Sequence, residues 1–415
     1  MNHTKNTSNG MTLVNRLEGV ICRLKPLILG TAGTVFLASC ASNAPQDTFR
    51  PKGPNAQKID TLQKPVFAVA GIIGVIVAVA VVYSIVKFRD RGQPIPKQSH
   101  GNPALEITLT IIPALILAVV GVFTFRTVFD LNKTSDTQMI INVTGQQWWW
   151  EYDYPTNNEY GITQPIITSG QLVIPVGTKV LLRETSRDVI HSYWIPALNG
   201  KRDAVPGRIT LNRIEADEPG IYAGQCTEFC GLSHANMRME AVALSKEDFA
   251  KWVSNQLKTY TAPAENTLAK EGETVFLNQC TRCHQVNGLT RADGTPVIAA
   301  PDENVWSGAA PNLSHLMSRN TFAGAMFNLV TPECRTDVWK SESLTFGAKY
   351  LAGVDEPCLN QTDLRGWLRN APAMKPMYAN PALLAATGGK YRGMPNLGLS
   401  ESDIEKLVAY LLTLK

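Results

Sequence analysis

Two long uncharged apolar segments constrain this chain more than any other feature of its sequence. Val66 to Val86 contains 21 residues without a charge, and Ile107 to Phe125 contains 19. A helix needs about 20 apolar residues to cross the hydrocarbon core of a bilayer, so both segments are long enough. Pro113 in the second segment is tolerated in a membrane helix. The sequence therefore predicts a membrane protein with a two-helix transmembrane hairpin over residues 65–130.

The N-terminal residues have the pattern of an export signal. Basic residues precede the uncharged segment Pro26 to Ser39, which is too short for a span and ends in small residues. Leu37-Ala38-Ser39-Cys40 resembles the lipobox of bacterial lipoproteins. This pattern predicts a lipoprotein signal peptide over residues 1–39 and lipidation of Cys40, with an uncleaved anchor as the alternative.

The export signal sets the orientation of the hairpin. The loop between the spans is basic, as expected for a cytoplasmic loop, but the outer N-terminal segment, residues 40–64, is basic as well. Charge bias alone therefore leaves the orientation open, and the signal places both ends of the hairpin outside. About 290 residues after Phe125 then lie on the outer, periplasmic face of a bacterial cell membrane. A net charge of +4 without a basic stripe argues against nucleic-acid binding.

Short β-rich runs follow the second span and are separated by Gly, Pro and Asn turns. Such spacing is typical of an all-β sandwich or barrel. The runs are Ile140–Val143, Leu172–Ile174, Lys179–Leu182 and Ile209–Leu211. Apolar residues at helical spacing then predict a helix from Lys246 to about Lys258, and polar residues up to Asn266 predict a linker over residues 257–266.

A cluster of metal-binding side chains lies near the end of the β-rich region. The twelve residues from Cys226 to Met237 contain Cys230 and His234 as well, and His191 lies 35 residues upstream of Cys226. Thiolate, thioether and imidazole ligands select copper, and two thiolates can bridge two copper ions. A disulfide and a zinc site are the alternatives.

The methionine of this cluster is not fixed by spacing. Met239 shares a strand face with Met237 by the period of two, so either thioether could face the thiols.

A second metal motif, Cys280-Thr281-Arg282-Cys283-His284, has the C-x-x-C-H pattern of covalent c-type haem attachment. The two thiols would form thioethers to the haem vinyl groups, and His284 would be the proximal iron ligand. A redox dithiol and half of a zinc site are the alternatives. Haem attachment occurs on the exported side, which agrees with the topology.

The first cluster resembles a known family. Asp188-Val189-Ile190-His191-Ser192-Tyr193-Trp194, together with the Cys226–Met237 segment, resembles subunit II of the haem–copper cytochrome c oxidases. The resemblance implies a cupredoxin-like all-β Greek-key sandwich over residues 137–256 that binds a dinuclear CuA centre. The implied copper ligands are His191, Cys226, Glu228 through its backbone carbonyl, Cys230, His234 and Met237.

The same resemblance implies roles for three further side chains. Trp148, the first Trp of an aromatic run, would pass electrons to copper, although such runs are more often core. Glu228 would also bind a magnesium ion at the interface with subunit I. Glu106, at the cytoplasmic start of the second span, would stand at the mouth of a proton path; a solvated interfacial carboxylate is the alternative.

Residues 267–415 resemble an all-α class I cytochrome c domain. An amphipathic helix precedes the haem motif, and Ser400 to Leu414 predicts a terminal helix capped by Ser400. Gly393-Met394-Pro395 resembles the family's ligand loop, which makes Met394 the expected sixth ligand of the haem iron. The other methionines considered are Met317, Met326, Met374 and Met377.

The remaining cysteines form one pair. Once copper, haem, lipid and the signal peptide account for the others, Cys334 and Cys358 are left in an insertion at residues 321–362. An even pair in an oxidising compartment predicts a disulfide.

The expected function is that of subunit II of a respiratory cytochrome c oxidase with its electron donor fused to the C-terminus, similar to the caa-type bacterial oxidases. Electrons would pass from haem c to CuA and on to subunit I, with subunit III and an upstream cytochrome or bc-type complex as further partners. The enzyme reduces oxygen and translocates protons, but the six His of this chain provide no oxygen-reducing site.

Three alternatives carry related chemistry. A nitrous oxide reductase would need a His-rich catalytic copper site, which the six His of this chain do not allow. A quinol oxidase subunit would lack the copper ligands, which are present here. A membrane-tethered copper and haem electron carrier serving another terminal reductase is the alternative that the sequence leaves open.

Overall fold

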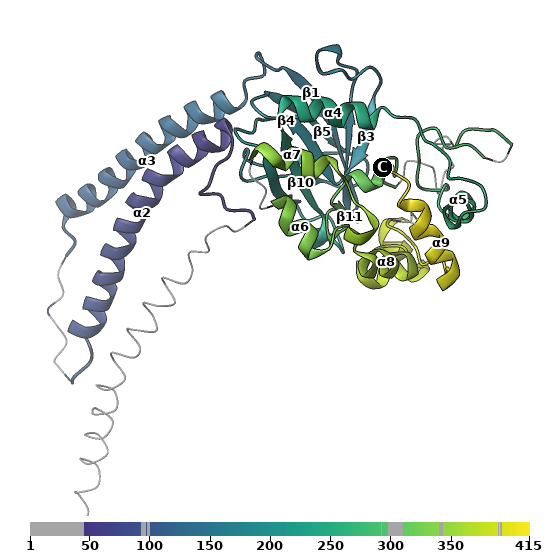
Figure 1. The fold of residues 1–415 in the computed structure, drawn as a ribbon. Coiled ribbons are helices and arrows are strands. Elements are labelled where there is room, and N and C mark those ends of the chain that lie inside the picture. The colour runs from purple at the N-terminus through teal and green to yellow at the C-terminus, as the bar shows by residue number, and fades with distance from the viewer. Residues whose placement is uncertain are drawn as a thin grey trace, which may run out of the picture. The chain divides into compact units, whose positions relative to one another are not determined.

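The computed structural model describes residues 45–92, 97, 100–291, 293–297, 310–339, 343–388, 390 and 392–415 (Figure 1). The expected signal peptide and Cys40 lie outside the described residues. Residues Thr48–Lys415 form one compact unit.

Two helices have the length and composition of membrane spans. They are α2 (Pro54–Lys87) and α3 (Pro103–Leu131), with mean hydropathies of 2.8 and 2.5 over their most apolar windows. Their apolar side chains are exposed in the described chain, which suits contact with lipid. The Asn102 side chain caps α3 by accepting a hydrogen bond from the backbone N–H of Leu105.

Helix α2 starts twelve residues before the uncharged segment. Pro54 occupies a first-turn position, where a missing N–H costs nothing. The next residue, Asn55, is buried and donates a hydrogen bond to the Arg213 carbonyl at 2.6 Å. The polar start of α2 is therefore fixed to the β-rich domain, whereas the apolar part of the helix begins only at Val66.

The β-rich region forms two main sheets. The five-stranded sheet has the order β3-β2-β1-β5-β8, with β1 parallel to β5, and the three-stranded sheet has the order β4-β10-β9. A small hairpin, β6-β7, carries His191. The strands are β1 (Met139–Gln146), β2 (Trp149–Tyr154), β3 (Ile166–Ser169), β4 (Gln171–Pro175), β5 (Val180–Ser186), β6 (His191–Tyr193), β7 (Arg202–Ala204), β8 (Thr210–Ile214), β9 (Gly220–Gln225) and β10 (Arg238–Leu244). The four predicted runs lie in β1, β4, β5 and β8, and the sandwich is cupredoxin-like as expected.

Strand alternation produces the core of this sandwich. In β1, Met139, Ile141 and Val143 are buried, whereas Ile140 between them is 43% exposed. Aromatic side chains of β2 fill the space between the sheets. Helix α4 (Lys246–Gln256) packs its Trp252 ring against Tyr154, with ring centroids 5.2 Å apart. The predicted helix after the β-rich region is therefore confirmed as one side of the core.

The C-terminal region is helical. Helices α5 (Leu268–Gln279) and α9 (Glu401–Leu411) pack closely at Gly272. This glycine has no Cβ, and a Cβ there would clash with the Lys406 carbonyl. Ser400 caps α9 by accepting from the Asp403 N–H, as the sequence predicted. Helix α8 (Gln361–Met374) packs beside α9. The short 3-10 helices of the described chain are Asn158–Tyr160, His234–Asn236, Leu316–Ser318, Glu356–Cys358 and Pro381–Thr387.

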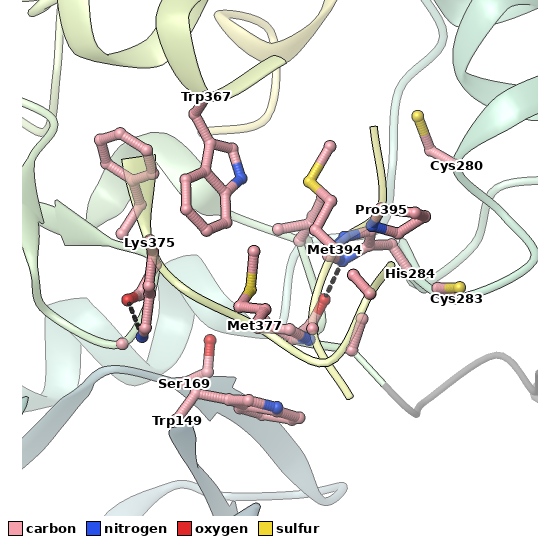
Figure 2. Close-up of a pocket in the computed structure, with 18 of the residues that line it drawn as sticks. Trp149, Ser169, Cys280, Cys283, His284, Trp367, Lys375, Met377, Met394 and Pro395 are labelled. Carbon is pink, nitrogen blue, oxygen red and sulfur yellow. Dashed lines mark hydrogen bonds between the residues drawn. The ribbon is translucent and has the colours of Figure 1, made fainter. Parts of the chain in front are cut away.

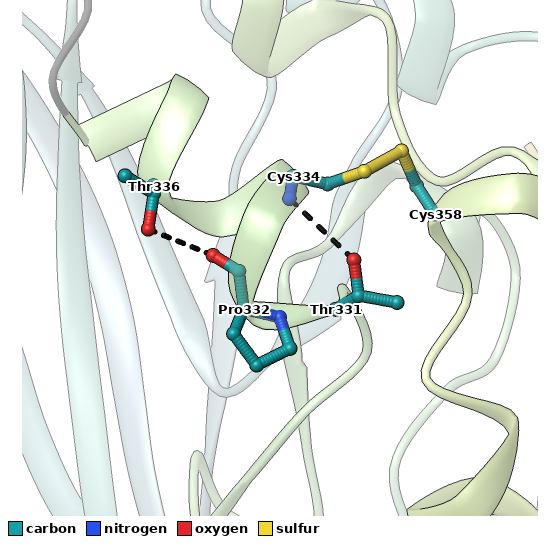
Figure 3. Close-up of a disulfide and its surroundings, with 5 residues drawn as sticks. All are labelled: Thr331, Pro332, Cys334, Thr336 and Cys358. Carbon is teal, nitrogen blue, oxygen red and sulfur yellow. Dashed lines mark hydrogen bonds between the residues drawn. A yellow bond between two sulfur atoms is a disulfide. The ribbon is translucent and has the colours of Figure 1, made fainter.

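The insertion at residues 321–362 forms its own small elements. These are β11 (Thr321–Phe322), β12 (Phe327–Asn328), α6 (Pro332–Trp339) and α7 (Ser343–Leu351). A disulfide joins Cys334 at the start of α6 to Cys358 (Figure 3). Phe346 and Tyr350 of α7 belong to the same buried apolar cluster as the sandwich core. The insertion therefore packs the helical region against the sandwich.

Buried polar contacts join the same two regions. The guanidinium of Arg319 donates to Ser169 Oγ at 2.9 Å and to the Asn312 carbonyl at 2.7 Å. Oε1 of Gln171 in β4 accepts hydrogen bonds from the Tyr350 hydroxyl and from the backbone N–H of Asn320, both at 3.1 Å. Because these groups are buried, they need hydrogen-bond partners inside the protein, and Ser169 Oγ and Gln171 Oε1 have theirs across the interface.

Candidate metal and haem sites

Two buried thiols lie at the centre of the first site. Cys226 and Cys230 follow β9, and their Sγ atoms are 3.8 Å apart, whereas a disulfide needs about 2.05 Å. Each thiol has its own imidazole. Nδ1 of His191 lies 3.9 Å from Cys226 Sγ, and Nδ1 of His234 lies 3.5 Å from Cys230 Sγ. The site therefore consists of two thiol–imidazole pairs of similar geometry.

A weak donor completes each pair. The thioether sulfur of Met237 lies 3.8 Å from Cys230 Sγ, and the Glu228 carbonyl oxygen lies 3.3 Å from Cys226 Sγ. The other candidate, Met239, is inside β10, where its Sδ packs against Gly224. The geometry thus brings the Met237 sulfur to the thiols. Glu228 itself is an exposed residue.

The electrostatics of the site favour a thiolate and a fixed imidazole. The hydrogen bond with Cys230 lowers the pKa of Cys226, against the opposing effect of burial. Nε2 of His191 is bonded to Asp188 Oδ1 at 2.8 Å, which leaves Nδ1 directed at the thiol. Burial by itself would lower the pKa of His191, but Asp188 and Cys226 raise it. Copper binding would require His191 to release this proton, and thiolate, neutral imidazole and thioether donors then form a set that suits copper.

Trp148 is hydrogen-bonded directly to this site. Its indole Nε1 donates to the Cys230 carbonyl at 2.9 Å, and the Gln147 amide donates to the same oxygen at 2.7 Å. Trp148 is only 2% exposed. The ring predicted to carry electrons is therefore connected to the backbone of a candidate copper ligand.

The second site is a cavity of about 830 Å³ (Figure 2). Cys280, Cys283 and His284 line it, and both thiols are free. His284 Nδ1 lies 2.7 Å from the Pro311 carbonyl, so Nδ1 carries the proton and Nε2 is left to bind a metal. Burial raises the pKa of Cys280 to about 12 and lowers that of His284. Volume, thiols and imidazole therefore fit a covalently attached haem.

Two methionines line this cavity, Met394 and Met377. Gly393, with a φ of +106°, allows the backbone to approach Met377, because a Cβ there would clash with the Met377 sulfur. Met374 instead packs on Gly366 of its own helix, with Sδ 3.0 Å from the position of a Cβ. Met317 is fully buried in the core of the helical region. The structure thus leaves Met394 and Met377 as the described methionines beside the haem position.

Glu106 and Met326, which were considered from the sequence, lie away from both sites. Glu106 is an exposed residue in the first turn of α3 and is not among the described residues that line the cavity. Met326 lies in the turn between β11 and β12. Cys40 lies outside the described residues.

Sequence reasoning missed Lys375, which lies between the two sites. This side chain is 2% exposed, and its Nζ donates to the Trp148 carbonyl at 2.8 Å and to the Ala323 carbonyl at 2.7 Å. Desolvation lowers the pKa of Lys375 to about 7. A lysine in a loop is normally solvated, so composition gave no signal for it. The only hint was its position between the candidate ligands Met374 and Met377.

Three family models match consecutive parts of the chain. The cytochrome c oxidase subunit II transmembrane domain matches residues 46–127, the periplasmic domain of the same subunit matches residues 139–243, and cytochrome c matches residues 269–326. These three regions correspond to the helical pair, the sandwich with the thiol cluster, and the start of the haem-motif region.

Two relatives match this chain over nearly their whole length. Cytochrome c oxidase subunit 2 of Alkalihalophilus pseudofirmus is 33% identical over 392 residues, covering 92% of this chain and 94% of the relative. The Bacillus subtilis protein of the same name is 29% identical over 419 residues, covering 95% and 97%. Among solved structures, the periplasmic domain of subunit II of cytochrome oxidase from Bradyrhizobium japonicum is 29% identical. The match covers 30% of this chain and 96% of that chain, with a TM-score of 0.28.

Proposed function

The chain belongs to the cytochrome c oxidase subunit II family, and we propose which of its residues carry electrons from the haem to the copper centre. The family places the protein in the membrane with a periplasmic domain, as a subunit of an oxidoreductase complex that contains subunit I. Electrons arrive at a covalent haem c and pass through CuA to subunit I.

The copper centre is assigned to His191, Cys226, Cys230, His234 and Met237, with the Glu228 carbonyl as a further weak donor. The observation that carries this assignment is the pair of thiol–imidazole units, each with one weak donor close to its thiol. When bound, the copper pair accepts and releases one electron. The hydrogen bonds that hold the His191 ring and the Cys230 carbonyl would limit rearrangement of the donors during electron transfer.

The haem is assigned to Cys280 and Cys283 through thioethers, with His284 and Met394 as axial ligands. The free thiols, the Nε2 atom of His284 and the lining position of Met394 support this assignment. A His/Met pair raises the reduction potential of a haem, as an electron carrier requires. Met377 is the competing sixth ligand.

Further roles follow the family resemblance. The exposed carboxylate of Glu228 would bind magnesium shared with subunit I, and Glu106 would admit protons at the cytoplasmic side. Lipidation of Cys40 would anchor the mature N-terminus. Subunit III and an upstream cytochrome or bc-type complex complete the proposed partners.

The copper assignment is tested by electron paramagnetic resonance of the full-length subunit. The wild type should show two copper ions sharing one unpaired electron, and Cys226→Ser or Cys230→Ser should abolish that signal. Met237→Ala should perturb the signal less, since a thioether is the weaker ligand. Met239→Ala is the matched control and should leave the signal unchanged. An isolated single-copper spectrum in the wild type would contradict the proposal.

A further inference from the structure

Four consecutive residues connect the two sites. We call Lys375–Tyr378 the bridging segment. Its first residue donates to the Trp148 carbonyl, and the carbonyl of Pro376 accepts a hydrogen bond from Ser233 Oγ in the loop that carries the thiols. Its third residue, Met377, lines the haem cavity with His284 (Figure 2).

The last residue of the bridging segment contacts Trp148 directly. The ring centroids of Tyr378 and Trp148 are 5.3 Å apart with an interplanar angle of 41°, which is within the range of favourable aromatic pairs. The Tyr378 hydroxyl also lies 3.3 Å from the position of a Cβ at Gly231, next to Cys230. One side chain therefore touches both the indole and the thiol loop, and its neighbour Met377 touches the haem cavity.

We propose that Tyr378 is a second aromatic contact for electron transfer between haem and copper, and that Lys375 is the positioning residue that holds it against Trp148. This inference rests on the proposed function. With both groups bound, the step would be the transfer of one electron from the reduced haem to the oxidised copper pair. The side chains of Tyr378 and Trp148 are neither oxidised nor reduced, so no proton moves.

The positioning role follows from the hydrogen bonds of Lys375. Its ammonium group joins the Trp148 carbonyl to the Ala323 carbonyl of the turn between β11 and β12. Gly324 in that turn is so close to the Trp148 carbonyl that a Cβ would clash. Without Lys375, two carbonyls would face each other in a buried space without a donor, which is unfavourable. Loss of the amine should therefore separate the bridging segment from Trp148.

The test uses the assembled oxidase and rapid photoreduction of the fused haem, followed by the decay of its absorbance as copper is reduced. Tyr378→Leu should slow this step by about tenfold or more, equivalent to about 1.4 kcal/mol of barrier. Tyr378→Phe keeps the ring and should restore most of the lost rate. Lys375→Met should also slow the step, and Lys375→Arg should recover part of it. Lys349→Met, an exposed residue of α7, is the matched control and should match the wild type.

A second readout separates positioning from general damage. Hydrogen exchange should increase in Lys375→Met around Trp148 and the bridging segment, but not in α9. The copper resonance spectrum and the haem spectrum should be unchanged in every variant. A wild-type rate in Tyr378→Leu with both spectra intact would overturn this inference but not the proposed function. Absence of either spectrum in the wild type would overturn the proposed function instead. Equal rates and equal exchange in Lys375→Met and wild type would refute the positioning role.

Discussion

Removing the disulfide of the insertion should loosen the contact between the haem region and the sandwich. The bond joins Cys334 and Cys358, which are 24 residues apart, and the loop it closes contains α7 with its core residues Phe346 and Tyr350. The chain-entropy relation gives about 3.5 kcal/mol for a loop of this length. The backbone N–H of Thr331 still donates to the Cys358 carbonyl at 2.8 Å, so the double Cys→Ser variant should keep the fold. Its main effect should be easier opening of the loop.

Hydrogen exchange of the detergent-solubilised subunit measures this opening. A cost of about 3.5 kcal/mol corresponds to a loss of protection of about 370-fold in α6 and α7. Helix α9, which lies outside the loop, is the internal control and should change little. Protection of α7 that falls by less than about tenfold would refute the entropic reasoning. An equal loss in α7 and α9 would show that the disulfide supports the whole helical region instead.

Two further outcomes are expected. Met394→Ala should abolish the sulfur-to-iron charge-transfer band of the ferric haem and lower its potential, whereas Met377→Ala should keep the band; the reverse result would reassign the ligand. Burial raises the pKa of Glu184 well above its usual value, so above about pH 4.5 the folded state holds one proton more than the unfolded state. Stability should then fall with rising pH by up to about 1.4 kcal/mol per unit, and Glu184→Gln should flatten that slope in thermal unfolding measured between about pH 5 and pH 8.

The metal sites were predictable because their donors are dense and local in the sequence. Five of the six copper donors lie within twelve residues, and the haem motif occupies five. The choice between Met237 and Met239 was not predictable from period two. Strand β10 begins only at Arg238, so Met237 belongs to the preceding turn, where strand alternation does not apply.

The interface between the sandwich and the helical region was not predictable, because its residues belong to no motif or periodic pattern in the sequence. Arg319, Lys375 and Tyr350 resemble ordinary surface or core residues until the fold places them against partners from distant elements. The insertion was recognised only as extra length with two cysteines. Its packing against the sandwich depends on contacts across more than a hundred residues of chain, which no local pattern encodes.

The hydrogen bonds of Gln171 with Asn320 and Tyr350 bear on how freely this fusion can be recombined. A foreign class I cytochrome joined through the predicted linker, residues 257–266, would be tethered to the sandwich but would have neither the insertion nor Arg319. It would leave Gln171 and Ser169 without their partners and would sample many orientations instead of one. Conversely, cutting the chain within those linker residues should yield two fragments that stay together, because buried hydrogen bonds and apolar contacts join them without the covalent connection. These contacts make the helical region a packed part of the subunit rather than an appendage on a tether.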